Sequence, residues 1–178
     1  MDQHVEPRYS AETIAARVDD VARKLDAEFA GQSLVLVSIL KGASVFLADL
    51  ARRMSAPVGC EYINVRRAEH PEKILQIDFT TQFAVAGRAV LLLKDVVNTG
   101  VIETYLITHL RDQGASSIQL AAIIDKEGER TTDIVVEHPL FSAAGGHFAG
   151  YGMEYRGRYA NLPYIAEVIG ADRVTTGQ

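Results

Sequence analysis

The chain has 178 residues, of which 48% are hydrophobic and 23% are charged, and its formal net charge is −5. This length supports one well-buried core and is too short for two, so we expect a single domain spanning residues 1–178. The acidic balance argues against a broad basic surface, and therefore against nucleic acid as the main partner.

The sequence also lacks the features of a membrane or secreted protein. No apolar run reaches the length needed to cross a bilayer, and the first residues lack the basic and apolar regions of a secretory signal. Cys60 is the one cysteine, which excludes a disulfide within the chain and favours a reducing compartment. We therefore expect a cytoplasmic protein that makes no contact with a membrane.

The first predicted element is an amphipathic helix. Ser10 has a typical N-cap side chain, apolar residues follow at helical spacing, and Gly31 lies just past the expected end. Residues 33–40 are then almost continuously apolar, which favours a strand buried on both faces. Lys41 and Gly42 predict a tight turn after that strand.

The next predicted elements are a helix at residues 43–54 and strands at residues 58–65 and 73–79, with a polar loop at 66–72 between the strands. The residues of the helix that we expect to face the sheet are Val45, Phe46, Leu47 and Leu50.

Residues 89–106, AVLLLKDVVNTGVIETYL, form the most informative segment. The apolar run at 90–93 predicts a buried parallel strand, and the apolar spacing from Val101 to Gly114 predicts a helix that ends at a glycine. A loop between such elements points backbone N–H groups and the positive end of a helix dipole at an anion. We expect the chemistry at residues 94–100, although Asn-Thr-Gly is also ordinary turn chemistry.

Two more strands are predicted at residues 117–124 and 133–137, and the glycine-rich segment 145–157 does not have the composition of a core. The alternation of strands and helices predicts an α/β fold with a doubly wound, mainly parallel sheet and right-handed crossovers.

Four motifs in order give the chain a resemblance to type I phosphoribosyltransferases, in particular to the bacterial hypoxanthine-guanine enzymes. They are LVLVSILKG at 34–42, KDVVNTG at 94–100, IIDK at 123–126, and GYGMEY at 150–155 with NLPYI at 161–165. The resemblance implies a small hood lobe made by the two chain ends. It also implies transfer of ribose 5-phosphate from phosphoribosyl pyrophosphate to a purine-like base, with Mg²⁺, by a homodimer or homotetramer.

The resemblance assigns the two phosphate-bearing ends of the substrate to different loops. Lys41 and Gly42 match the turn whose backbone holds pyrophosphate. Thr99 and Gly100 match part of the cradle for the 5-phosphate. Glu154 stands where the family has an aspartate that contacts metal-bound pyrophosphate.

The resemblance also assigns residues to the base. Lys126 matches the family lysine that recognises the exocyclic oxygen of a 6-oxopurine. His147, with Phe148 beside it, falls where the family stacks an aromatic ring on the base. Each residue also has an ordinary interpretation, Lys126 as a lysine of a polar turn and His147 as a loop histidine.

The candidate site departs from the family at the ribose and at the base. The family has two adjacent acids that bind the ribose hydroxyls, whereas this chain has Lys94 and Asp95. Asn98 replaces an aspartate, and an amide cannot act as a base. Asp95, Asn98 and Lys126 are the candidate catalytic residues, Lys94 is a candidate substrate contact, and Asp95 and Glu154 are the candidate Mg²⁺ ligands.

Three further family features are altered. Ile102 replaces a hydroxyl residue of the phosphate cradle, and Ala160 aligns with an arginine that helps to hold pyrophosphate. The segment at residues 65–72 is shorter than the mobile loop of the family and lacks the Ser-Tyr pair of that loop.

These departures leave several functions open. The leading hypothesis is phosphoribosyl transfer to a purine or related base, either in salvage or in a biosynthetic pathway where Lys94 acts on a new substrate group. The alternative is a non-catalytic sensor or partner subunit that binds a nucleotide or phosphorylated metabolite. A third hypothesis, an RNA-binding regulator, is disfavoured by the acidic charge balance.

Overall fold

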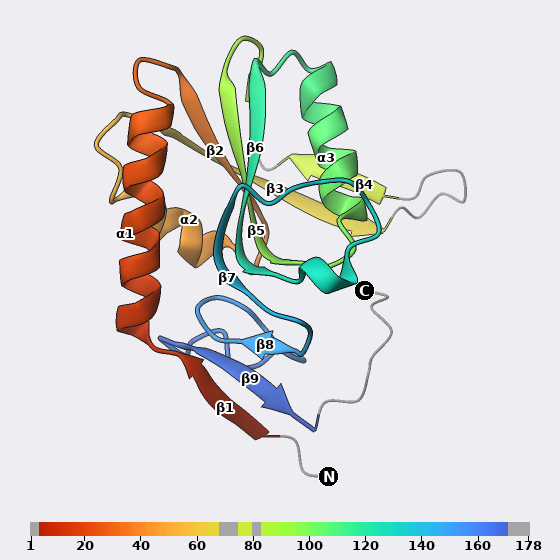
Figure 1. Ribbon diagram of the computed structural model, residues 1–178. Coiled ribbons are helices and arrows are strands. Elements are labelled where there is room, and N and C mark those ends of the chain that lie inside the picture. Colours follow the sequence, from red (N-terminus) through yellow and green to blue (C-terminus); the bar gives the residue numbers. More distant parts are fainter. Residues whose placement is uncertain (1–3, 68–74, 80–82, 171–178) are drawn as a thin grey trace.

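The computed structural model describes residues 4–67, 75–79 and 83–170 (Figure 1). Its core is a six-stranded sheet with the order β4-β3-β2-β5-β6-β7, in which β4 runs antiparallel to β3 and the other neighbours are parallel. The strands are β2 (Leu34–Ile39), β3 (Gly59–Arg67), β4 (Leu75–Phe79), β5 (Ala89–Val97), β6 (Ser117–Asp125) and β7 (His138–Ser142).

Helices cover both faces of this sheet, so the predicted doubly wound α/β fold is confirmed (Figure 1). Because side chains alternate along a strand, Leu91 and Leu93 of β5 pack with the first two helices, and Val90 and Leu92 pack with the third. The helices are α1 (Ala11–Glu28), α2 (Ser44–Ala51) and α3 (Val101–Asp112).

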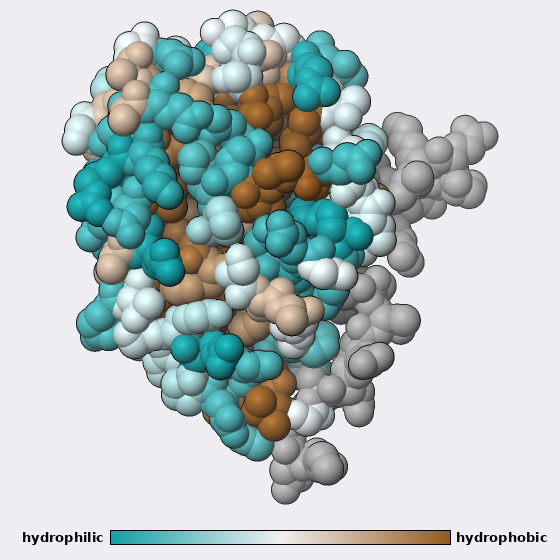
Figure 2. Space-filling model, in the orientation of Figure 1, coloured by the Kyte–Doolittle hydropathy of each residue, from teal (hydrophilic) through white to brown (hydrophobic). Residues whose placement is uncertain are grey.

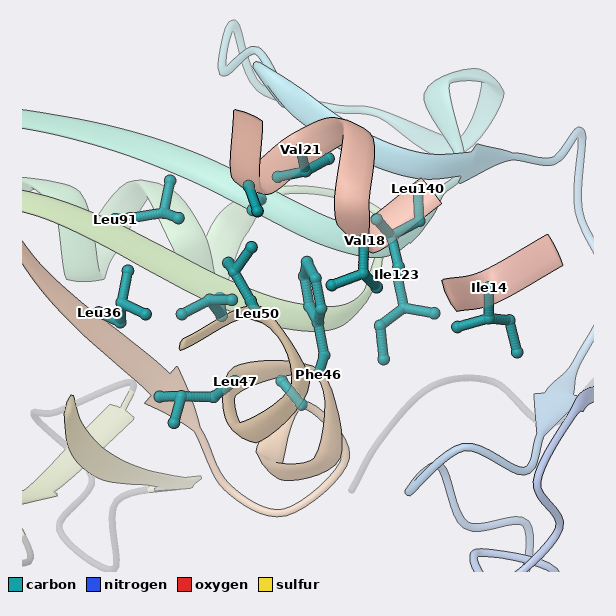
Figure 3. Close-up of a cluster of buried hydrophobic side chains, with 14 of the residues drawn as sticks. Ile14, Val18, Val21, Leu36, Phe46, Leu47, Leu50, Leu91, Ile123 and Leu140 are labelled. Carbon is teal, nitrogen blue, oxygen red and sulfur yellow. The ribbon is translucent and has the colours of Figure 1, made fainter. Parts of the chain in front are cut away.

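The larger core cluster lies between the sheet and α1 and α2. Figure 3 shows Val18 of α1 beside Phe46 and Leu50 of α2, and all three side chains are almost completely buried. Each buried side chain of this kind contributes about 1.5–3 kcal/mol relative to its exposed state. The predicted start of α1 is also confirmed, because Ser10 accepts a hydrogen bond from the Thr13 backbone N–H at 3.2 Å.

The two ends of the described chain form the expected hood lobe. Its three-stranded antiparallel sheet has the order β1-β9-β8 and lies below the main sheet in Figure 1. Its strands are β1 (His4–Tyr9), β8 (Phe148–Ala149) and β9 (Ile165–Ile169). Among the described residues, no helix combines the length and apolar character needed to span a bilayer.

Two strand predictions are corrected by the structure. Residues 133–137 form no strand, and Val135 is 66% exposed; the strand is β7, which begins at His138. β7 lies at the edge of the sheet. Pro139 has no backbone N–H, and an edge strand tolerates this because one of its sides has no strand to bond. β5 extends through Val97, so part of the expected loop at 94–100 is strand.

The helix faces also differ from the predicted ones. Val45 is 39% exposed, although the sequence predicts that it faces the sheet, and Val101, the first apolar position of the predicted helix, is 45% exposed. The inward residues of α3 are Glu103, Leu106 and Leu110. The face shown in Figure 2 is mostly hydrophilic, and its apolar atoms gather in the upper half beside α3.

Cys60 lies in a strand, but its side chain is exposed. β4 pairs with β3 from Ile63 to Arg67, so the first residues of β3 have no described strand beside them on that edge. Cys60 is therefore an accessible thiol at a sheet edge. Its partial burial, and then the charge of Glu61, raise the pKa of that thiol.

The hood is attached to α2 through one short segment. The Tyr151 hydroxyl donates a hydrogen bond to Asp49 Oδ2 at 2.8 Å. A Cβ at Gly152 would lie 3.0 Å from the Gly42 carbonyl oxygen and 3.0 Å from Val45 Cγ2, so the two backbones approach closely. The exposed Val45 therefore faces the hood and not the sheet.

Substitution of Tyr151→Phe tests this attachment. Burial, and then the bond to Asp49, raise the pKa of Tyr151, so the phenol remains a protonated donor at every ordinary pH. We expect the variant to lose about 1 kcal/mol of unfolding free energy in urea denaturation. The control Tyr105→Phe changes an exposed ring and should stay within about 0.5 kcal/mol of wild type. Equal stability of both variants would contradict the attachment.

Candidate active site

The sequence-predicted site residues come together at the carboxyl edge of the main sheet. The turn after β2, the loop after β5 and the segment after β6 all start at this edge, because the three strands are parallel neighbours. Loops at this edge of an open α/β sheet usually bind the ligand. The hood segment 150–154 covers the same edge through its contact with Gly42.

Gly42 brings the turn after β2 against β5. A Cβ at Gly42 would lie 2.7 Å from Asp95 Cγ and would overlap its carboxylate, so only glycine fits there. The Lys41 carbonyl accepts a hydrogen bond from the Ser44 N–H at 3.0 Å, and the peptide bond between Leu40 and Lys41 is cis. The expected pyrophosphate turn thus lies directly beside the expected ribose residue.

The loop after β5 is held in place by hydrogen bonds from the segment that follows β6. The Thr99 carbonyl accepts hydrogen bonds from the Thr131 N–H at 3.0 Å and the Thr132 hydroxyl at 3.1 Å. Gly100 is the N-cap of α3 with φ of 83°, a left-handed conformation that favours glycine. The first N–H groups of α3, which have no partner within the helix, therefore lie beside a fixed loop, as an anion site requires.

Lys94 and Asp95 form an ion pair at the end of β5. The Lys94 ammonium contacts Asp95 Oδ1, which also accepts the Val96 N–H at 2.8 Å. The two side chains are only 18% and 25% exposed. Burial alone would raise the pKa of Asp95, but the ammonium and the hydrogen bonds outweigh it and lower that pKa. Burial acts against the charged lysine too, yet Asp95 raises the pKa of Lys94.

Glu103 is a third charged residue here, and no pattern in the sequence indicates its role. It lies in the first turn of α3, where acids are common because they stabilise the helix dipole, yet it is only 3% exposed. Burial raises the pKa of Glu103, while Lys94 and Arg130 act in the opposite direction.

Lys126 is a buried residue and not a solvated turn lysine. It is 5% exposed, its N–H donates to the Val97 carbonyl at 3.0 Å, and its Nζ lies 3.6 Å from Glu129 Oε1. Asn98, beside it at the end of β5, has a buried Oδ1 with no hydrogen-bond partner among the described residues. An acceptor and a cation thus lie on adjoining strand ends, as recognition of a polar ring requires.

Arg130 is another cation that sequence reasoning missed, and its side chain is only 11% exposed. It pairs with Asp125, and its Nε and Nη1 are buried without a hydrogen-bond partner in the described part of the chain. Burial raises the pKa of Asp125, and Arg130 opposes this. The sequence gives the pair no distinguishing spacing, because the connecting segment is irregular.

The hood residues differ in how well they suit a substrate. Glu154 has a 42% exposed side chain whose Oε1 lies 3.9 Å from Lys41 Nζ. The His147 ring is partly exposed and tilted against Tyr155, with centroids 5.8 Å apart. Phe148 is 8% exposed and packs in the larger core cluster, so its ring is not available to a base. We keep His147 alone as the candidate stacking residue.

The remaining expected features are placed as follows. Ile102 packs against the core on the α3 side of the sheet, and Ala160 accepts a hydrogen bond from the Gly152 N–H at 3.0 Å. Residues 65–67 of the loop expected at 65–72 belong to β3, and the rest of that loop lies outside the described residues.

Of the two predicted Mg²⁺ ligands, Glu154 suits the ion better than Asp95. No group of three potential ligand side chains occurs among the described residues. Mg²⁺ commonly uses one carboxylate together with substrate phosphates, which the exposed Glu154 can provide. Asp95 already contacts Lys94, the Val96 N–H and the Gly42 turn. Glu154 is therefore the stronger candidate, and Mg²⁺ binding at either carboxylate stays a prediction.

Comparisons with known proteins agree with this geometry. The profile of the phosphoribosyl transferase domain family matches residues 8–143. The chain belongs to the phosphoribosyltransferase family. The hypoxanthine-guanine phosphoribosyltransferase of Bacillus subtilis (strain 168) is 30% identical over 162 residues, which are 88% of each chain. The bifunctional protein TilS/HprT of Listeria innocua is 28% identical over 162 residues, and the chain spans 24% of its length.

Solved structures of this phosphoribosyltransferase family have the same fold. A hypoxanthine-guanine phosphoribosyltransferase from Bacillus anthracis, with a HEPES molecule in its active site, has a TM-score of 0.86 and 26% identity, covering 94% of this chain and 99% of its own. A hypoxanthine phosphoribosyltransferase from Staphylococcus aureus has a TM-score of 0.84 and 26% identity, covering 92% and 90%. The resemblance and the fold class predicted from the motifs are confirmed.

Substitution of Gly42→Ala tests the approach of the turn to β5. The added methyl group would overlap the Asp95 carboxylate, so we expect a loss of about 1–3 kcal/mol in unfolding free energy. The control Gly145→Ala places its methyl group 3.5 Å from Glu129 Oε1, an ordinary contact, and should be tolerated. A Gly42→Ala variant as stable as the control would show that the turn does not lie against Asp95.

Proposed function

We propose that the chain transfers the ribose 5-phosphate group of phosphoribosyl pyrophosphate to a purine or related heterocyclic base. The observation that carries the proposal is the buried side chain of Lys126 on the strand end next to that of Asn98, whose buried Oδ1 has no hydrogen-bond partner among the described residues. An ammonium has three donors, and one ion pair at 3.6 Å leaves donors for the exocyclic oxygen of a base. Membership of the phosphoribosyltransferase family supports the same reaction class.

We assign the substrate groups to the loops described above. The 5-phosphate binds at Thr99, Gly100 and the start of α3. The diphosphate binds at the turn of Lys41 and Gly42, and Glu154 holds a Mg²⁺ ion that arrives with it. Bound Mg²⁺ would neutralise charge on the leaving diphosphate.

The base and the reacting carbon lie between these two ends. Lys126 and Asn98 bind the edge of the base, and His147 offers a ring face for stacking. The bond from the ribose carbon to pyrophosphate breaks, and a bond to a ring nitrogen forms. The Asn98 amide cannot take the ring proton, which passes to water or to the departing pyrophosphate. The Asp95 carboxylate faces the positive charge on the sugar, with Lys94 partly offsetting it.

We also propose that the chain folds as a single domain, that it is located in the cytoplasm, and that it forms a homodimer or homotetramer. The hood bond from Tyr151 to Asp49 supports one domain, because it ties the lobe to the core. The exposed free thiol of Cys60 suits a reducing compartment.

A second candidate function is binding without turnover, as a sensor or partner subunit. The observation that favours it is the pairing of Lys94 with Asp95, because a neutralised carboxylate stabilises a sugar cation less well.

A turnover assay separates these two functions. We expect release of pyrophosphate from phosphoribosyl pyrophosphate with at least one of hypoxanthine, guanine or xanthine. Lys126→Met should lower kcat/KM by about ten- to a hundredfold, the cost of a lost hydrogen bond to a charged donor. The control Lys24→Met changes an exposed lysine of α1 and should leave turnover unchanged. Conversion of no base, together with a higher Tm in the presence of nucleoside monophosphates, would favour the sensor.

A further inference from the structure

Lys94 and Asp95 start on opposite sides of the sheet. Side chains alternate along β5: Leu91 and Leu93 face α1 and α2, and Val90 and Leu92 face α3. By the same alternation, the Lys94 side chain points to the α3 side of the sheet, where Glu103 lies buried. The Asp95 side chain points to the other side, which faces the Gly42 turn. The ion pair joins the two sides at the end of the strand.

Protein groups lie against both oxygens of Asp95, and Oδ1 has bonded partners. Oδ1 contacts the Lys94 ammonium and accepts the Val96 N–H. Oδ2 lies against Gly42, so closely that a methyl group on that glycine would overlap it. Mg²⁺ needs near-ideal octahedral geometry and keeps several waters, and the Lys94 ammonium already takes the position on Oδ1 that such an ion would use.

The charges nearby favour a cation at the position of the Lys94 ammonium. The Asp95 carboxylate contacts this ammonium, and the 3% exposed Glu103 is close enough to help raise the pKa of Lys94. Removal of the lysine charge would leave the largely buried Asp95 carboxylate without the cation that contacts it, which is costly unless another cation binds.

We propose that the Lys94 ammonium is a built-in cation of the ribose site, which occupies the place where a divalent ion would otherwise bind to Asp95. Metal then enters only with the diphosphate, at Glu154. The inference rests on the proposed function for the identity of the ribose, but the metal binding can be measured without turnover. Binding of a nucleoside monophosphate, which lacks the diphosphate, is therefore independent of divalent cations.

The test is a titration of the metal-free full chain with Mn²⁺, in the absence of base and phosphoribosyl pyrophosphate. Electron paramagnetic resonance and calorimetry measure the binding. Wild type and Asp95→Asn should give the same titration. Lys94→Glu should gain a saturable Mn²⁺ site, which the double variant Lys94→Glu with Asp95→Asn loses again. A wild-type site that Asp95→Asn removes would overturn the proposal, as would a folded Lys94→Glu protein with no new site.

Two further measurements keep the proposal open to failure. If circular dichroism shows that Lys94→Glu does not fold, Lys94→Gln removes the cation without adding an acid and should gain a weaker Mn²⁺ site; its absence would count against the proposal. The Kd of inosine monophosphate should change by less than about twofold between EDTA and Mg²⁺, because an absent metal cannot couple to the ligand. Neither measurement depends on catalysis, so failure of the turnover assay would leave their outcomes interpretable.

Discussion

Asp95 lies between two neighbours that together set the geometry of the site. The Lys94 ammonium contacts one of its oxygens, and the backbone of Gly42 packs against the other. The Gly42 turn in turn supports Gly152, whose backbone brings the hood down onto the edge of the sheet. A larger residue at Gly42 would overlap the Asp95 carboxylate and push the turn and the strand apart.

A buried ion pair of this kind has two effects. Removal of two charges from water is costly, so the pair contributes little net stability compared with apolar packing, but breaking it by removing one partner is strongly unfavourable. Lys94 and Asp95 therefore fix each other's position more than they stabilise the fold. The same pair lowers the negative charge offered to the sugar, which shifts more of the binding onto the phosphate loops and onto Lys126.

The sequence predicts those parts of the fold that depend on local patterns. The Ser10 cap, the apolar run of β2 and the Gly100 loop each have a signal within a few residues, and the ordered motifs identify the family. The edge strand β7 was misplaced because Val135 and its neighbours have strand-like composition but no partner strand. Sheet order, which the sequence does not state, decides that outcome.

The sequence predicts where the site lies, but not which of its charged side chains contact one another. The motifs place Lys94, Asp95 and Lys126 on neighbouring strand ends, since parallel strands share one carboxyl edge. Burial of Glu103 and Arg130 depends on how α3 and an irregular segment pack over that edge, which no spacing encodes. Likewise, which carboxylate meets which ammonium follows from side-chain directions at the end of a twisted strand.

A double-mutant cycle on Lys94 and Asp95 tests this account most directly. Unfolding free energies of wild type, Lys94→Met, Asp95→Asn and the double variant give the coupling energy of the pair. The structure predicts a favourable coupling of about 1 kcal/mol or more, as expected for contacting residues in one ion pair. A coupling indistinguishable from zero, with all four proteins folded, would contradict the account, because the two side chains would then not interact in solution.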